Sequence, residues 1–291
     1  MKSSRSEFLD VRGLRYHLRQ WGEPGMPVLF MLHGWMDVSA SFQFLVDELQ
    51  RDWYVIAPDW RGFGLTQYPA TDAYWIPDYL GDLDAILHHY SPERAVTLVG
   101  HSMGGNVASL YAGTRPERVR KLVNLEGFGL REIAASKAPA RYARWLEELR
   151  QPQQLAPYAS QADVARRLQK NNSHLTDARA AFLSQHWAAP DAQGQWTILG
   201  DPAHKRINPV LHRLDEMEAF WRAIRAPVLC VEAQESSLWQ WFGEKGGARE
   251  EIDRRIAWLA DARFLMVADA GHMVHHDQPA LLAKAIEDFL A

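Results

Sequence analysis

Residues 100–105 read Gly-His-Ser-Met-Gly-Gly, which places one serine between glycines in the pattern G-x-S-x-G. An apolar run that predicts a strand, residues 95–99, precedes this segment, and residues 106–114 have the pattern of a helix. A serine in this context is typical of a sharp turn that exposes its hydroxyl at the edge of a sheet. The segment therefore predicts that Ser102 is a nucleophile.

A serine hydroxyl becomes a good nucleophile only when a base takes its proton, and His272 is the histidine best placed to do so. It follows residues 263–267, which read as the last strand, and it precedes the last helix. We therefore expect it at the same edge of the sheet as Ser102. His275 and His276 follow closely, but no metal-binding motif such as H-E-x-x-H accompanies them. We interpret both as surface residues or residues behind the site, and we expect no metal and no cofactor.

Two carboxylates are candidates for the acid that would orient His272 and stabilise its protonated form. Glu126 ends the expected strand 119–125, and Glu235 follows the expected strand 227–231. Glu126 is favoured because it leaves a buried strand directly into a glycine, where a charged group needs a partner. Glu235 stays open as the alternative.

An acyl-transfer intermediate also needs N–H donors that stabilise its oxyanion. His33-Gly34-Trp35 directly follows the apolar run 28–32. The backbone N–H groups of Trp35 and Met103 are therefore the expected oxyanion hole.

The elements that must position these residues alternate between short apolar runs and amphipathic stretches. This alternation predicts a mostly parallel sheet with helices on both faces. It is interrupted at residues 129–214, where prolines divide a mostly helical stretch without the same strand pattern. We expect a core domain of residues 1–128 and 215–291, with residues 129–214 inserted as a helical cap.

Composition narrows the classes of function. The chain has 291 residues, 47% hydrophobic and 23% charged, with a net charge of -4 and one cysteine. That charge is too small to predict a nucleic-acid partner, and one cysteine cannot form an internal disulfide. No signal peptide and no membrane-spanning stretch is visible, so we expect a cytoplasmic protein without a membrane partner, either a monomer or a homodimer.

Four segments together resemble the α/β-hydrolase fold superfamily, in its serine-nucleophile branch. They are HGW at 33–35, DWRGFGLT at 59–66, GHSMGG at 100–105 and AGH at 270–272. The resemblance implies a twisted, mostly parallel sheet flanked by helices, with a cap or lid inserted after the sixth strand. It also implies that the segment 59–66 supports the active-site loops. The cap makes the chain similar to serine hydrolase-like proteins and lidded esterases.

The sequence departs from this superfamily at the acid. Most members carry an aspartate at the position of Ser236, and a serine cannot stabilise an imidazolium as a carboxylate does. A subset of members carries the acid at the end of the earlier strand, where this chain has Glu126.

These observations predict a cofactor-independent serine hydrolase, most simply a carboxylesterase acting on small to medium hydrophobic esters. C–C bond hydrolysis of ring-fission-type diketones is the alternative reaction, because the same residues support it. A non-catalytic ligand-binding protein on this scaffold is the alternative from another class. Aromatic residues that could border the substrate pocket are Trp35, Phe128, Trp187, Trp239 and Trp241.

Overall fold

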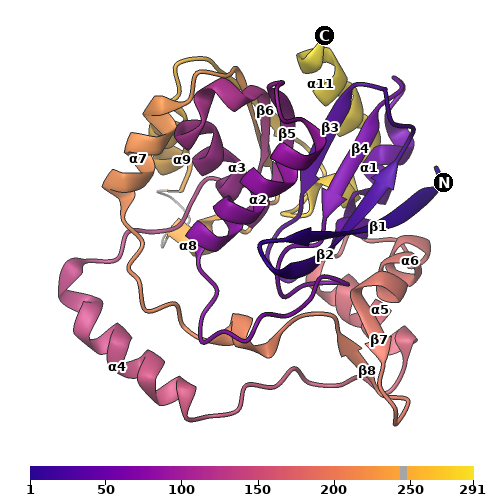
Figure 1. Ribbon diagram of the computed structural model, residues 1–291, viewed down its shortest axis with the longest axis vertical. Helices are drawn as coiled ribbons and strands as arrows, with labels where there is room; N and C mark the ends of the chain where they lie inside the picture. The colour runs from indigo at the N-terminus through magenta and orange to yellow at the C-terminus, as the bar shows by residue number, and fades with distance from the viewer. Residues whose placement is uncertain (243–247) are drawn as a thin grey trace.

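A twisted sheet runs through the computed structural model, which describes residues 1–242 and 248–291 (Figure 1). Within these residues it has eight strands, in the spatial order β1-β2-β4-β3-β5-β6-β9-β10. The first two strands form an antiparallel hairpin and β2 pairs antiparallel with β4, whereas the pairs from β4 to β10 are parallel. The strands are β1 Ser4–Val11, β2 Leu14–Trp21, β3 Val28–Leu32, β4 Tyr54–Pro58, β5 Val96–His101, β6 Val119–Leu125, β9 Val228–Ala233 and β10 Ala262–Val267.

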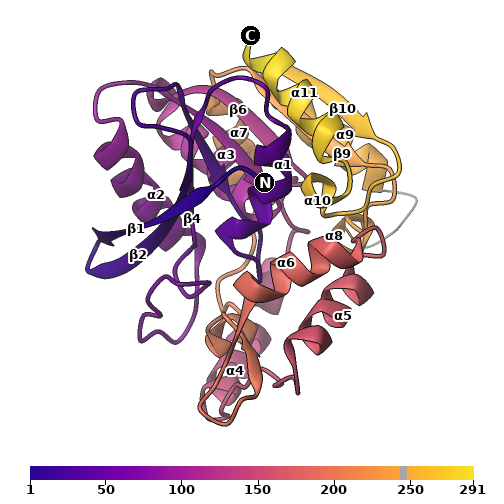
Figure 2. The ribbon, with the colours of Figure 1, turned by 90° about the vertical axis from the view of Figure 1, so that its right-hand side faces the viewer.

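Two apolar clusters, one on each face, hold the sheet between layers of helices. One cluster joins β-strand side chains to α2, α3, α7 and α9, and the other joins them to α1 and α11 (Figure 2). Because β3, β4 and β5 are buried on both faces, they read in the sequence as continuous apolar runs. The helices of these layers are α1 Gln43–Glu48, α2 Ile76–Tyr90, α3 Met103–Thr114, α7 Leu214–Ala223, α8 Trp239–Phe242, α9 Ala248–Ile256, α10 Val274–Asp277 and α11 Pro279–Leu290, with short 3-10 turns at Ser39–Phe42 and Pro116–Arg118.

The fold is therefore the expected α/β-hydrolase architecture, and the strands expected at 28–32, 95–99, 119–125, 227–231 and 263–267 correspond to β3, β5, β6, β9 and β10. Residues 39–50, whose apolar residues recur with helical spacing, do not form one helix. The chain instead forms a 3-10 turn at Ser39–Phe42 followed by the short helix α1.

The inserted segment, residues 129–214, follows β6 and lies along one end of the sheet (Figure 1). Its elements are a 3-10 turn at Ala135–Lys137, α4 Ala138–Leu149, α5 Gln161–Asn171, α6 Asp177–Trp187, β7 Ala188–Pro190, β8 Trp196–Ile198 and a 3-10 turn at Pro202–Lys205. The antiparallel hairpin of β7 and β8 is absent from the sequence prediction, since strands of three residues show no clear alternation. Its turn depends on Gly194, whose φ is 78°.

The inserted segment packs on the core through α5 and α6. Val164 and Trp187 join a buried cluster with Val38 and Ala40, and Leu183 joins another with Phe44. By contrast, α4 has no buried residue and lies apart from the sheet in Figure 1. Among the described residues, no helix combines the length and apolar composition needed to cross a membrane.

Candidate active site

Ser102 occupies a strained turn between β5 and α3. Its φ of 51° and ψ of -114° lie outside the regions that a non-glycine residue ordinarily adopts. The flanking glycines permit this turn because there is no room for side chains. A Cβ on Gly100 would lie 2.5 Å from the carbonyl oxygen of Gly104, and a Cβ on Gly104 would lie 2.1 Å from that of Leu32. The turn therefore fixes Ser102 at the N-terminal end of α3.

His272 lies within hydrogen-bond distance of the serine. Its Nε2 is 3.0 Å from Ser102 Oγ, and its side chain is 24% exposed, so a substrate can reach the pair. Two contacts fix the segment between β10 and α10 that carries it. Nε2 of His101 lies 2.8 Å from the His272 carbonyl oxygen, and the Gly271 amide donates to Oδ2 of Asp277 at 2.8 Å.

Glu126 lies on the side of the His272 imidazole that faces away from Ser102. Its Oε2 is 3.0 Å from Nδ1 of His272, and the residue is only 1% exposed. Oε1 accepts a hydrogen bond of 2.6 Å from the Ala233 amide, and Oε2 accepts one from the Ser236 hydroxyl. Two hydrogen-bond donors besides His272 therefore hold this carboxylate in place.

Glu235, the alternative acid, is directed elsewhere. Its side chain is 56% exposed, and its Oε2 lies 3.1 Å from Nε2 of His174 in the inserted segment. The structure thus brings Glu126, and not Glu235, to His272. The sequence holds a signal for this, because the serine at position 236 leaves room for a carboxylate from β6.

The segment with the expected oxyanion donors lies directly against Ser102. A Cβ on Gly34 would be 3.2 Å from the Cβ of Ser102, so the backbone before Trp35 closely approaches the nucleophile. Met103 is the first residue of α3, where backbone N–H groups lack partners inside the helix. The two amides proposed for the oxyanion hole are thus carried by segments on either side of Ser102.

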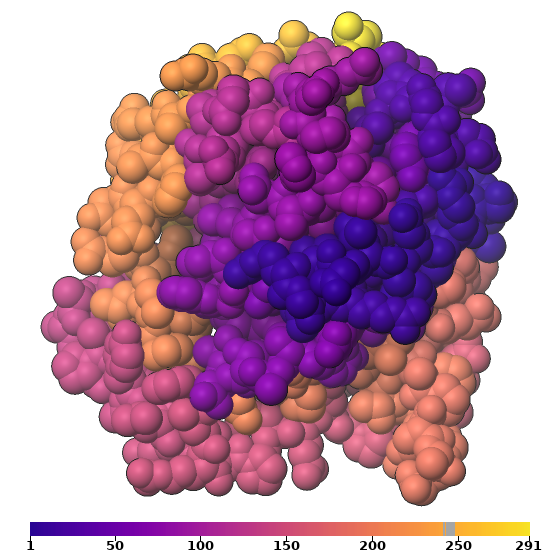
Figure 3. Space-filling view, viewed as in Figure 1, coloured from indigo at the N-terminus to yellow at the C-terminus, as the bar shows by residue number. Residues whose placement is uncertain are grey.

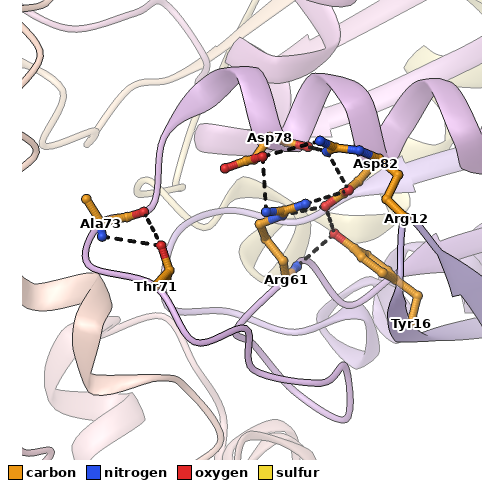
Figure 4. Close-up of polar contacts among 7 residues, drawn as sticks. All are labelled: Arg12, Tyr16, Arg61, Thr71, Ala73, Asp78 and Asp82. Carbon is orange, nitrogen blue, oxygen red and sulfur yellow. Dashed lines mark hydrogen bonds and ion pairs between the residues drawn. The ribbon is translucent and has the colours of Figure 1, made fainter.

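A buried hydrogen-bond network fixes the segment that follows β4 and, through it, residues 33–35. The amide of Trp60 donates to Nε2 of His33, and its indole donates to the His33 carbonyl oxygen, both at 2.9 Å. The next residue, Arg61, donates to both carboxylate oxygens of Asp82 at 2.6 and 2.7 Å (Figure 4). Tyr16 and Arg12 also donate hydrogen bonds to the Asp82 carboxylate.

The same segment holds Asp59, whose carboxylate accepts from His17 and from the amides of Ser39 and Leu65. These contacts connect the segment 59–66 to the loops around Ser102, which is the supporting role that the family resemblance implies. A buried carboxylate needs hydrogen-bond donors around it, and these contacts supply them.

His275 and His276 are not surface residues, and that part of the sequence interpretation is wrong. They are 0% and 4% exposed. Helix α10 turns both rings inward, where the His275 ring packs 4.5 Å from that of His101. Nε2 of His276 contacts the hydroxyl of Ser41. Both therefore lie behind the site, because the 3-10 turn that begins at Ser39 covers them.

The expected pocket residues differ widely in their exposure. Phe128 is fully buried, and Trp187 is 8% exposed with its indole donating to the Met36 carbonyl oxygen at 2.7 Å. Trp239 is half-buried in α8, and the side chain of Trp241 lies outside the described residues. Trp35 is 50% exposed.

A cavity of about 470 Å³ lies between α2, α3, α7 and the inserted segment. On the face shown in Figure 3, the surface is hollowed between α7, in orange, and α2, in purple. Its described lining includes Asn106 and Leu110, one and two turns along α3 from Met103, but not Ser102 or His272. Other lining residues include the apolar Trp75, Leu80, Leu130, Ile133, Met217 and Phe220 and the charged Arg131, Arg141, Arg213 and Glu216.

The alpha/beta hydrolase fold family model matches residues 27–279 of this chain. The chain belongs to the alpha/beta hydrolase fold family. This member is 27% identical to the serine hydrolase-like protein of Danio rerio, over 100% of this chain and 90% of that protein. Membership and this relative support a hydrolase activity.

Two solved structures share the fold of this alpha/beta hydrolase. The thioesterase domain from the curacin biosynthetic pathway has a TM-score of 0.88 and 23% identity, covering 98% of this chain and 99% of that one. An esterase from Mycobacterium tuberculosis has a TM-score of 0.73 and 19% identity, covering 100% of this chain and 92% of that one.

Proposed function

We propose that this protein is a cofactor-independent serine hydrolase, specifically a carboxylesterase that acts on small to medium hydrophobic esters through an acyl-enzyme. The observation that carries the proposal is the line of two 3.0 Å contacts, from Ser102 Oγ to His272 Nε2 and from His272 Nδ1 to Glu126 Oε2. A hydroxyl, an imidazole and a buried carboxylate in this order are the chemistry of a catalytic triad.

In the first half of the reaction, Ser102 Oγ forms a bond to the ester carbonyl carbon while its proton passes to His272 Nε2. Glu126 stabilises the imidazolium that results, and it also fixes the tautomer that leaves Nε2 free to accept. The amides of Trp35 and Met103 stabilise the negative charge on the carbonyl oxygen. The intermediate then collapses, the ester C–O bond breaks, and the alcohol leaves with the proton from Nε2.

In the second half, a water molecule attacks the acyl-enzyme. His272 takes a proton from this water, the second oxyanion forms at the same two amides, and the Ser102–acyl bond breaks. The acid product leaves, and Ser102 recovers its proton from Nε2. The reaction consumes one water and changes no oxidation state.

The mostly apolar lining of the cavity along α3 supports a hydrophobic substrate. Similarity to a solved esterase supports ester chemistry only by analogy of fold.

The non-catalytic alternative depended on the missing aspartate at position 236. Glu126 removes that argument, because it supplies a carboxylate to His272 from another strand. The C–C hydrolase alternative uses the same three residues, so the substrate must distinguish the two reactions.

The test measures turnover of nitrophenyl esters of increasing chain length beside a dienoic ring-fission diketone, with wild type and Ser102→Ala. The proposal predicts turnover of the esters with a burst of nitrophenol, and at least a 10³-fold loss in Ser102→Ala. Turnover of the diketone alone would instead assign the C–C reaction. Ester turnover that is unchanged in a folded Ser102→Ala protein would overturn the mechanism.

A further inference from the structure

Three buried polar side chains meet behind His272. Asp37, His101 and His275 are 7%, 1% and 0% exposed, and each brings a ligand atom within 4.8 Å of the other two. They come from three segments: the loop after β3, the end of β5 and the start of α10. The sequence shows no such cluster, because its members are far apart along the chain.

Each of the three carries a buried polar atom without a hydrogen-bond partner among the described residues. These atoms are Oδ2 of Asp37, Nδ1 of His101 and Nδ1 of His275. Buried polar atoms without a partner destabilise the folded state, so three of them on neighbouring side chains call for a common partner.

One nitrogen of each histidine ring has a hydrogen-bond partner, and for His101 that partner leaves a lone pair on the other nitrogen. Nε2 of His101 faces the His272 carbonyl oxygen at 2.8 Å, and since a carbonyl only accepts, Nε2 carries the proton and Nδ1 is a free acceptor. Nε2 of His275 lies 3.2 Å from the Ser41 hydroxyl, so this ring too has one nitrogen anchored. Metal-binding histidines are held in this way, with one nitrogen on a backbone or side-chain partner and the other on the ion.

We propose that Asp37, His101 and His275 bind one divalent transition-metal ion of the class of Zn²⁺. Two imidazole nitrogens and one carboxylate oxygen suit such an ion, whereas Mg²⁺ and Ca²⁺ prefer oxygen ligands. Ligands about 2.0–2.2 Å from an ion lie about 3–4 Å from one another. One possible ligand atom of each residue lies within 4.8 Å of those of the other two, so binding requires these atoms to move closer by about 1–2 Å.

Such an ion would tie together the segments that carry the proposed active-site residues. His101 precedes Ser102, Asp37 follows Trp35 by two residues, and His101 holds the His272 carbonyl oxygen. The ion takes no part in the proposed hydrolysis, and the inference stands whether or not the protein is an esterase. It departs from the expectation of no metal.

The test measures metal content and thermal unfolding of the full chain. The protein is treated with EDTA, equilibrated with Zn²⁺ and desalted. The bound zinc is then measured by elemental (inductively coupled plasma) mass spectrometry. We expect about one zinc per chain and a rise in Tm of about 5 °C at zinc concentrations well above Kd. In Asp37→Asn and His275→Gln the bound zinc is expected to fall at least tenfold, and the rise in Tm to disappear.

Two matched variants separate this site from other places where zinc could bind. His174 forms an exposed pair with Glu235, and His272 lies beside Glu126. His174→Gln and His272→Gln should each keep the zinc and the rise in Tm. Zinc that is lost in either of these variants but kept in His275→Gln would overturn the proposal.

A measurement on the wild type keeps the test independent of variants that fail to fold. Crystals soaked in Zn²⁺ should give an anomalous difference peak between Asp37, His101 and His275. An ordered water there without anomalous signal would overturn the proposal, since a water that bridges the three groups would then be their common partner.

Discussion

Ser236 donates its hydroxyl hydrogen to Oε2 of Glu126, the same carboxylate oxygen that faces Nδ1 of His272. Most members of the family carry an aspartate at position 236. Ser236 is therefore still in contact with the group formed by Ser102, His272 and Glu126. It no longer supplies the charge, but it helps to hold the carboxylate that does. This relationship explains why a serine at position 236 is compatible with an acid directly after β6.

Replacing Glu126 with glutamine should lower kcat by about 10²–10⁴-fold, because the imidazolium loses its charged partner and its tautomer is no longer fixed. Glu235→Gln is the matched control, since Glu235 contacts His174 instead, and it should keep kcat within about twofold. The measurement is kcat and KM on the best nitrophenyl ester. A larger loss in Glu235→Gln than in Glu126→Gln would assign the acid to Glu235.

Moving the acid back to position 236 should restore part of the activity. In the double variant Glu126→Gln, Ser236→Asp, the new carboxylate is on residue 236, whose side chain contacts Oε2 of Glu126 in the wild type. We expect kcat at least about tenfold above that of Glu126→Gln alone. Ser236→Asp alone should be less active than wild type, because two carboxylates would then repel each other in one buried place. No recovery in a folded double variant would show that position 236 cannot reach His272.

The sequence was sufficient to predict the α/β fold and the contact between Ser102 and His272. Continuous apolar runs mark the parallel strands, and glycines on both sides of Ser102 mark a turn that leaves no room for side chains. Both features depend on residues close together along the chain. The catalytic roles of these residues stay predictions.

Other features could not be predicted, because they depend on where separate segments meet. Residue types alone do not show which way Glu235 points, and in the structure its carboxylate contacts His174 of the inserted segment. Burial of His275 depends on the turn that begins at Ser39. The cavity along α3 combines side chains from α2, α7 and the inserted segment, which are far apart along the chain.

Gly34→Ala should lower kcat by about tenfold or more while leaving the protein folded. The new methyl group would lie 3.0 Å from Nδ1 of His101 and 3.2 Å from Cβ of Ser102, so it would move the backbone that carries the Trp35 amide. Gly200→Ala is the matched control, because its nearest neighbours would be 3.7 Å away. Equal activity of the two variants would remove the support for residues 33–35 as the oxyanion segment.

The folded protein should lose stability as the pH falls from about 6.5 toward 4. Burial lowers the pKa of His33 to about 4 and those of His204 and His276 to about 3, whereas a histidine in the unfolded chain has a pKa of about 6.5. Between these values the unfolded chain binds protons that the folded chain excludes, so the free energy of unfolding falls with decreasing pH. Urea unfolding at pH 7, 6 and 5 measures this slope.

Two carboxyl groups have the opposite effect on the pH dependence of the free energy of unfolding, because burial raises the pKa of Asp37 and of Glu232 to about 7. Burial also lowers the pKa of both His101 and His275 well below the ordinary value, so the histidines should dominate. His204→Phe should reduce the slope by about one proton and keep the ring between Phe63 and Tyr74. The exposed control His88→Phe should leave it unchanged. A stability that rises as the pH falls to 5 would contradict this assignment.

The central claim is that His272 activates Ser102, and the most direct test is reaction with a fluorophosphonate probe followed by peptide mass spectrometry. The account predicts one adduct, on the peptide that contains Ser102, and its loss in His272→Ala under the same conditions. Circular dichroism of the variant confirms that it is folded. An adduct on another serine, or labelling of Ser102 at an equal rate in His272→Ala, would contradict the claim.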